Sequence, residues 1–508
     1  MTKPSEVAAL RARMAELSDL HGVSMLLFWD QQTMMPAAGA AARAERSATI
    51  ALAIHARESD PELGALLDAL EPWAAGEDPD SDDVRLVYWA RRDFEKSVRV
   101  PAELTAEISK ANALGQQAWQ EARAANDFGR FRDALARQIE LRHRYVACFD
   151  GHEHPYDALL DDFEPGLTTA ELRPLFAELR DALVPIVAAA GASDHVVRNG
   201  GAFLGRFGAD AQRIAVLDVL EGIGFDPDSM RLDPTVHPFA AAIAPDDIRL
   251  TTKYDEQDFA VALYCGLHEF GHGLYQARVD RSLFRTTLDD PVSLGVHESQ
   301  SRLWENVIGR SRPFCAWLVP RLAARLPAAL NGLDAEGLYR AVNTVQPSLI
   351  RTEADETTYN LHIILRFELE LALTEGTLAV DDLPAAWDEG MQRLLGVEVT
   401  GPAEGVLQDV HWSAGHLGYF PTYTLGNLLA AQLWVRLQDD LPDVDELLER
   451  GDFGPVREWL REHVHRHGRK FPPRELVRRV TRSDLTIDPF LRYLREKLTD
   501  SGVLAPTA

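Results

Sequence analysis

Residues 268–272, HEFGH, place two histidines four positions apart with a glutamate directly after the first. On a helix, side chains four residues apart lie about 6 Å apart along the axis and on nearly the same face. His268 and His272 could therefore bind one metal ion, with Glu269 close to the ion on the adjoining face. Zinc held in this way polarises a carbonyl and acidifies a water, and the glutamate accepts a proton and later donates it to the leaving amine. The motif predicts metal-assisted hydrolysis.

A catalytic zinc site needs a third protein ligand and an open position for water. One known pattern adds a third histidine at a position where this chain has Arg278, so that pattern is excluded. A carboxylate on a later helix is the expected ligand instead. The segment 293–309 has helical periodicity and offers Glu298, with Glu305 in reserve two turns further along nearly the same face. The alternative is that Glu298 is a solvated acid on a helix surface.

The elements that must position these residues are mostly helical, because apolar residues recur at spacings of three and four through most of the chain. The clearest exception is the segment 231–258, where alternating apolar residues at 248–252 predict a short strand. Asp255 is expected to cap the helix that carries both histidines. Loops are predicted near 71–83 and 191–203. The fold class is all-α with at most a small β-sheet near the metal site, in one domain spanning 1–508 that could form two lobes.

Composition limits the class of protein. The 508 residues include 46% hydrophobic and 26% charged residues, which is ordinary soluble usage, and no run approaches the ~18 apolar residues of a membrane span. The formal charge of −27 argues against a nucleic-acid surface. Three scattered cysteines and an N-terminus without a signal-peptide pattern favour a cytoplasmic protein. We expect neither a nucleic-acid partner nor a membrane partner.

Six stretches, HEFGH among them, occur together along the chain and resemble the carboxypeptidase Taq family of metallocarboxypeptidases. They are HPF at 237–239, DIRLT at 247–251, HEFGH at 268–272, HESQ at 297–300, IRTEAD at 350–355 and GVLQDVHW at 405–412. The resemblance implies an almost all-helical, zincin-like body with a deep active-site cleft, usually a homodimer. It implies a zinc-dependent exopeptidase of broad specificity that removes single C-terminal amino acids from peptides. Carried over by position, it makes His268, His272 and Glu298 the zinc ligands and Glu269 the general base.

A carboxypeptidase must hold the terminal carboxylate of its substrate, and the planar fork of arginine suits that task. Arg351 is the leading candidate, and the resemblance indicates it too. The alternative is a surface ion pair with Glu353 or Asp355. Arg249 is a weaker candidate because Asp247 lies two residues away on the same face of the predicted strand and could simply pair with it.

His237, His411 and Tyr423 could hydrogen-bond the scissile carbonyl or the substrate backbone as charge develops. The motifs that contain His237 and His411 place them at the cleft of the family. A structural role is the alternative for each: a loop anchor for His237, a buried polar network with Gln408, Asp409 and Trp412 for His411, and core packing for Tyr423.

Other residues near these motifs receive structural interpretations. His297 diverges from Glu298 by about 100° on a helix, so we expect it not to be a ligand. The histidines in 461–471 are interpreted as cationic groups at a helix C-terminus that Gly468 ends. Cys265 is expected to be inert. Gly271 and Gly273 could let another backbone, substrate included, approach the metal-binding face.

Two other functions remain open at this point. One is an endo-oligopeptidase or dipeptidase on a similar helical scaffold, and the other is a catalytically silent peptide-binding protein. Zinc itself is an inference from the ligand types, since a site of two histidines and one glutamate also accepts cobalt.

Overall fold

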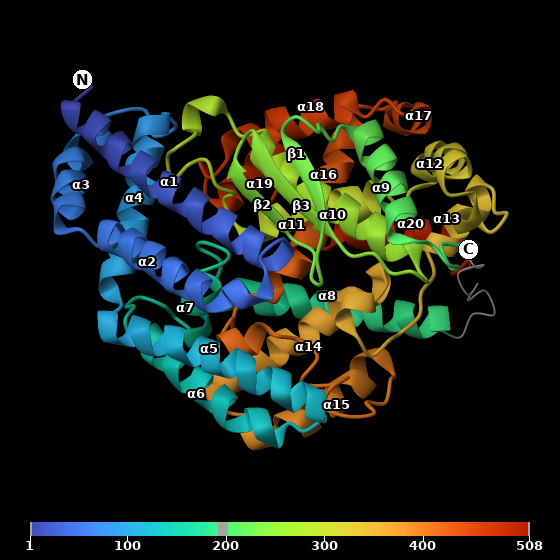
Figure 1. Cartoon of the computed structure of the whole chain (residues 1–508), viewed down its shortest axis with the longest axis horizontal. Coiled ribbons are helices and arrows are strands. Elements are labelled where there is room, and N and C mark those ends of the chain that lie inside the picture. Colours follow the sequence, from blue (N-terminus) through green and yellow to red (C-terminus); the bar gives the residue numbers. More distant parts are fainter. Residues whose placement is uncertain (1–2, 192–201, 506–508) are drawn as a thin grey trace.

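A computed structural model describes residues 3–191 and 202–505 (Figure 1). Its N-terminal part contains the helices α1 (Ser5–Thr33), α2 (Ala40–Glu58), α3 (Pro61–Ala74), α4 (Asp82–Arg99), α5 (Ala102–Ala125), α6 (Gly129–Val146), α7 (Pro155–Leu160), α8 (Thr169–Gly191) and α9 (Ala209–Ile223). None of the described helices is both long and apolar enough to cross a membrane. The loop predicted near 71–83 is shorter than expected, because α3 continues to Ala74 and α4 begins at Asp82. Most of the loop predicted near 191–203 lies outside the described residues.

The C-terminal part is again helical. It contains α10 (Phe259–Ala277), α11 (Leu294–Arg302), α12 (Arg312–Arg325), α13 (Ala335–Val342), α14 (Glu356–Glu375), α15 (Leu383–Leu395), α16 (Pro421–Asp440), α17 (Val444–Arg450), α18 (Gly454–His463), α19 (Pro473–Thr481) and α20 (Asp488–Asp500). Helix α11 continues directly into a π-helical turn, Leu303–Ile308, a geometry that often marks functional sites.

A three-stranded sheet precedes the histidine helix, and its strand Asp247–Thr252 contains the alternating residues that predicted a short strand. Strands β1 (Met230–Pro234), β2 (Ala240–Ala244) and β3 (Asp247–Thr252) lie in the order β1-β3-β2, with β1 parallel and β2 antiparallel to β3. Ile248 and Leu250 are fully buried and lie against Gly273 of α10, where a Cβ atom would be 2.6 Å from Leu250. The missing side chain therefore lets α10 pack closely on the sheet. The prediction of a mainly helical fold with a small sheet beside the metal-binding helix is confirmed.

Two hydrophobic clusters form the interior. One contains the sheet with α9, α10 and α12, and the other contains α6, α8, α14 and α15. In Figure 1 the first group lies in the upper half and the second in the lower half. Helix α16 belongs to both clusters, because Leu429 and Leu433 pack into the first while Leu425 and Leu428 pack into the second. The single domain over 1–508 remains a prediction.

The histidine helix begins later than predicted. Asp258, and not Asp255, is its N-cap residue, and its side chain accepts a hydrogen bond from Ala260 N at 2.8 Å. The expected start is wrong because the chain before Phe259 pairs with the segment 203–207: Glu256 O accepts from Phe207 N, and Phe259 N donates to Phe203 O. Backbone committed to that pairing cannot form the first helical turn.

Candidate metal centre and active site

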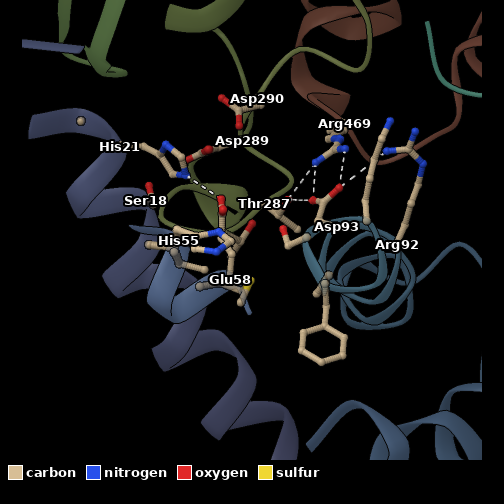
Figure 2. A pocket seen from close by; sticks show the side chains of 18 of the residues that line it. Ser18, His21, His55, Glu58, Arg92, Asp93, Thr287, Asp289, Asp290 and Arg469 are labelled. Atoms are coloured by element: carbon tan, nitrogen blue, oxygen red, sulfur yellow. Dashed lines mark hydrogen bonds and ion pairs between the residues drawn. The ribbon is translucent and has the colours of Figure 1, made fainter. Parts of the chain in front are cut away.

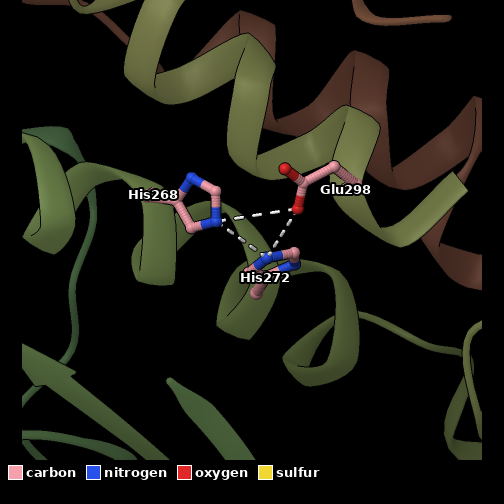
Figure 3. Close-up of side chains that lie close together, drawn as sticks. All are labelled: His268, His272 and Glu298. Atoms are coloured by element: carbon pink, nitrogen blue, oxygen red, sulfur yellow. Dashed lines mark hydrogen bonds and ion pairs between the residues drawn. The ribbon is translucent and has the colours of Figure 1, made fainter. Parts of the chain in front are cut away.

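His268, His272 and Glu298 converge on one point, as Figure 3 shows, with both histidines on α10 and the glutamate on α11. The two histidine Nε2 atoms lie 3.2 Å apart. Glu298 Oε2 lies 3.6 Å from His268 Nε2 and 3.4 Å from His272 Nε2. Among the described residues, this is the group of histidine, cysteine and acidic side chains that could hold a metal ion.

These separations fit a tetrahedral metal ion. With metal–ligand bonds of about 2.05 Å, two ligands of a tetrahedron lie about 3.3 Å apart. The three observed distances, 3.2, 3.4 and 3.6 Å, scatter around that value. Two imidazoles and one carboxylate are also a donor set of catalytic zinc sites, which leaves a fourth position open. The residues present therefore fit a bound divalent metal.

Glu305, the reserve ligand, lies on the opposite side of the His268 ring. Its Oε2 atom is 2.8 Å from His268 Nδ1, so the other ring nitrogen, Nε2, carries its lone pair toward the metal position. A carboxylate in this place fixes the tautomer and orientation of a ligand histidine. Arg302 Nη1, 3.2 Å away, helps to hold the pKa of Glu305 down at about 2 despite its burial.

Arg302 also holds Glu298. Its Nε atom donates to Glu298 Oε1 at 2.7 Å, and Ser301 donates to Oε2 at 3.1 Å. Burial alone would raise the pKa of Glu298, but Arg302 and the neighbouring histidines hold it well below its ordinary value. Glu298 is only 5% exposed, so the alternative of a solvated surface acid is wrong.

Two glycines allow three helices to meet at the metal position. A Cβ atom on Gly271 would lie 2.4 Å from the carbonyl oxygen of Gln300, so α10 and α11 touch there through their backbones. A Cβ atom on Gly426 of α16 would lie 2.5 Å from Cγ of Glu298. The prediction that another backbone approaches α10 closely at Gly271 is confirmed, and the approaching backbone is that of α11.

Glu269 is 6% exposed, and burial raises the pKa of its carboxyl group.

His297 is not part of the converging group, as expected. Its ring stacks on His272 with centroids 4.1 Å apart, and burial holds its pKa well below the ordinary value. A neutral, tilted ring therefore packs against His272. Burial also raises the pKa of the Cys265 thiol to about 12, which disfavours the thiolate and agrees with the prediction that Cys265 is inert.

The histidines of 461–471 were predicted to be cationic groups at a helix C-terminus that Gly468 ends. The structure differs from this prediction in one respect. Helix α18 ends at His463, and Gly468, at φ +47°, ends the following turn as expected. His465 is fully buried, and burial holds its pKa well below the ordinary value, so it is not cationic. Its Nε2 atom is instead 2.8 Å from Gln300 Oε1, which ties this turn to α11 two residues after Glu298.

Arg351 begins a short 3-10 turn, Arg351–Glu353, and is 6% exposed. Its Nε and Nη2 atoms donate to Asp409 Oδ1 at 2.9 and 2.8 Å, and Nη1 donates to Tyr359 at 2.8 Å. The alternative interpretation, a surface ion pair of Arg351 with Glu353 or Asp355, is therefore wrong. Asp409 also binds the fully buried Arg366, with Nε 2.7 Å from Oδ2. One carboxylate thus bridges two arginines, and their charges hold its pKa well below the ordinary range despite burial.

This arginine network lies beside the metal ligands. The Arg302 guanidinium, which binds Glu298, lies 4.4 Å from the centroid of the Tyr359 ring, whose hydroxyl accepts from Arg351. His411 Nε2 lies 3.2 Å from the Tyr423 hydroxyl, and the Arg351 guanidinium lies 5.0 Å from the Tyr423 ring centroid. Burial lowers the pKa of His411 to about 3, so its ring is neutral.

The structure does not bring Arg249 and His237 into this group. Arg249 pairs with Asp247 at 2.8 Å, as the alternative interpretation expected, and its guanidinium lies 4.2 Å from the centroid of a Trp29 ring. His237 is exposed in the loop between β1 and β2. Phe239, two residues later, packs against Phe28 of α1 with ring centroids 5.0 Å apart and anchors that loop.

Sequence reasoning missed Arg302, Arg366 and Tyr359. Arg302 could have been found, because it follows Glu298 by four residues and an i, i+4 arginine faces the same carboxylate. Arg366 carries no comparable signal, because its partner Asp409 is distant in sequence. Tyr359 carries none either, because its partner Arg351 lies before the helix that carries Tyr359.

A cavity of about 690 Å³ reaches α10, the helix that carries His268 and His272. It is lined by residues of α1, α2, α4, α5, α6 and β2, and by Gln276, which follows His272 by one turn of α10. Neither the three converging residues nor Arg351, His411 and Tyr423 line it.

Comparison with known proteins decides the family. The family model described as carboxypeptidase Taq (M32) metallopeptidase matches residues 9–498. The chain belongs to this family. The M32 chain is 42% identical to thermostable carboxypeptidase 1 of Thermus thermophilus, over 95% of this chain and 96% of that protein. It is 38% identical to carboxypeptidase 1 of Bacillus subtilis, over 94% and 95% of the two chains.

Solved structures agree. The M32 carboxypeptidase from Deinococcus radiodurans superposes with a TM-score of 0.92 at 41% identity, covering 98% of this chain and all (100%) of that one. A Pyrococcus furiosus carboxypeptidase gives a TM-score of 0.93 at 34% identity, covering 97% and 99%. The M32 protein is thus a metallocarboxypeptidase, and its family implies a divalent metal.

Proposed function

We propose that this M32 protein is a zinc-dependent carboxypeptidase that releases single C-terminal amino acids from peptides with broad specificity. The observation that carries the proposal is the convergence of His268, His272 and Glu298 at tetrahedral spacing beside the buried Glu269. The three converging residues are proposed as the metal ligands. Their donor set favours zinc, and cobalt could substitute.

When bound, zinc supplies Lewis acidity that polarises the scissile carbonyl and makes a water a stronger acid. Glu269 is proposed to take the proton of the attacking water and to deliver it to the leaving amine. Burial raises the pKa of Glu269, which brings this carboxylate closer to the proton affinity that a general base needs. Glu305 keeps His268 in the tautomer that faces the ion.

Arg351 is proposed to bind the terminal carboxylate of the peptide. Asp409 and Tyr359 occupy three of its five N–H donors, which leaves two for a ligand. Holding the guanidinium from two sides also fixes its orientation before substrate binds, which lowers the entropic cost of binding. Neutral His411 and Tyr423 are proposed to donate hydrogen bonds near the scissile carbonyl. Substrate contacts by Arg249 and His237 remain predictions.

An N-blocked dipeptide and its C-terminally amidated twin separate exopeptidase from endopeptidase activity. We expect the free acid to be cleaved at least 100-fold faster, because the amide cannot form a charge-assisted pair with Arg351. Equal cleavage of both would support the endo-oligopeptidase alternative. Incubation with a chelator should abolish turnover, and zinc should restore it.

Glu269→Gln tests the proposed base, because it keeps the shape of the side chain and removes its proton affinity. We expect kcat to fall by about 10²–10⁴-fold while zinc content stays the same. Normal turnover by this variant would refute the role of Glu269. A homodimeric state and a cytoplasmic location are also proposed, and light scattering and cell fractionation test them.

A further inference from the structure

The cavity that reaches α10 at Gln276 is lined by charged residues on two sides. Figure 2 shows His21, Glu58, Asp289 and Asp290 on one side and Arg92, Asp93 and Arg469 on the other. Arg469 pairs with Asp93 at 2.6 Å, and Arg92 pairs with Asp161 at 2.6 Å. The charges of these basic residues are therefore already balanced within the protein.

Arg142 of α6 also lines this cavity, and it differs from Arg92 and Arg469 because it has no ion pair. Among the arginines that the structure describes, Arg142 alone is partly buried and has neither a hydrogen bond nor an ion pair. Its Nε atom is buried without a partner. Burial without a compensating anion lowers the pKa of its guanidinium. Desolvating a charge without pairing it costs free energy, so such a group points to a ligand that arrives later.

The surroundings leave Arg142 without an anionic partner: its guanidinium lies 5.8 Å from the centroid of the Tyr145 ring, which carries no charge to pair with it. The nearest acid to influence it, Asp162, is already neutralised, because Lys96 lies 2.6 Å from its Oδ1 atom and Tyr145 donates to the same atom at 2.7 Å. Gly415 gives the guanidinium its space, because a Cβ atom there would lie 2.5 Å from Nη2 and 2.7 Å from Nε. The φ of Gly415, +67°, also favours glycine at this position.

Acidic residues also line this cavity. Burial and Asp290 raise the pKa of Asp289 to about 7, and Glu58 lies 3.5 Å from His21. Neither Asp289 nor Asp290 has an ion pair within the described part of the chain. Because Arg92 and Arg469 are already paired, an anionic group that entered the cavity would pair with Arg142.

The cavity also approaches the helix that carries both histidines of the converging group. It reaches α10 at Gln276, one turn beyond His272, and it borders the sheet at β2. If the C-terminal carboxylate binds Arg351, which does not line the cavity, the residues before the scissile bond must extend elsewhere from the metal. The cavity provides room for them.

We propose that Arg142 forms a subsite for the side-chain carboxylate of an aspartate or glutamate on the N-terminal side of the scissile bond. This inference rests on the proposed carboxypeptidase function. The Arg142 subsite makes the enzyme selective for acidic residues at one or two positions before the scissile bond, while the released residue stays broadly variable.

The test uses N-acetylated peptides that end in the same dipeptide and carry one glutamate at successive upstream positions, each paired with its glutamine twin. For the zinc-loaded enzyme we expect kcat/KM to be about tenfold higher for glutamate than for glutamine at one or two positions. Arg142→Met should bring that ratio to about one, and Arg142→Lys should keep part of it. Arg144→Met is the matched control on the same helix, because Arg144 pairs with Glu107, and it should keep the full ratio.

Three results would overturn the inference: a ratio near one at every position in the unaltered enzyme, an unchanged ratio in Arg142→Met, or an equal loss on all peptides in that variant. The last result would mean that Arg142 binds the terminal carboxylate or supports the fold. Calorimetric titration of the same peptide pairs into the unaltered protein and into Arg142→Met makes the same comparison with dissociation constants. It gives the ratio of affinities for the glutamate and glutamine peptides. Absence of any cleavage would refute the proposed function, and the calorimetric ratio would still decide the role of Arg142.

Discussion

Glu305→Gln should weaken zinc binding although Glu305 does not converge on the metal position. The carboxylate lies 2.8 Å from His268 Nδ1 and 3.2 Å from Arg302 Nη1. Glutamine can still accept a hydrogen bond from the imidazole, but it loses the charge. A hydrogen bond to a charged group contributes about 1.5–3 kcal/mol and a neutral one about 0.5–1.5, so the change costs roughly 1.4 kcal/mol. That corresponds to about tenfold in the dissociation constant, within the range known for partners of ligand histidines.

The assay is competition for zinc with a chelator of known affinity, which measures metal binding without any turnover. Glu305→Ala removes the acceptor altogether and should cost about 100-fold. Glu353→Gln, an exposed change elsewhere in the chain, is the control and should leave the affinity unchanged. An affinity in Glu305→Gln equal to that of the unaltered protein would refute the reasoning that this carboxylate orients His268.

Three further predictions concern the supports of the site. Gly426→Ala places a Cβ atom 2.5 Å from Cγ of Glu298, and thermal unfolding should show a loss of roughly 1–3 kcal/mol together with weaker zinc binding. Asp409→Asn leaves two buried arginines without their shared anion; urea unfolding should show a loss of roughly 3 kcal/mol, and KM should rise more than kcat falls. Glu164 accepts a hydrogen bond from Gly295 N at 3.0 Å and so holds the start of α11, the helix that carries Glu298. Burial raises the pKa of Glu164 to about 7, above its unfolded value, so its contribution to stability is present below about pH 4.5 and is lost as pH rises through about 7. In Glu164→Gln, denaturant midpoints measured from pH 5 to 8 should fall less steeply than in the unaltered protein, and parallel curves would contradict this.

The sequence alone determined the groups whose geometry is local. His268 and His272 face one point because both lie on one helix, and helical period fixes their relation. Glu298 could be chosen because its segment also has helical periodicity and because the family resemblance indicated it. The strand at 248–252 was readable from its alternation, since side chains of a strand point to opposite faces in turn.

Tertiary structure decided which charges meet. Asp409 pairs with Arg351 across 58 residues of sequence, and the nearer acids at 353 and 355 do not. Glu305 turned from a possible ligand into the partner of His268, because the π-helical turn sets its position relative to α10. The start of α10 moved from Asp255 to Asp258 because a distant segment pairs with the residues between them. Local periodicity cannot encode such pairings, which depend on how helices and loops far apart in the chain pack together.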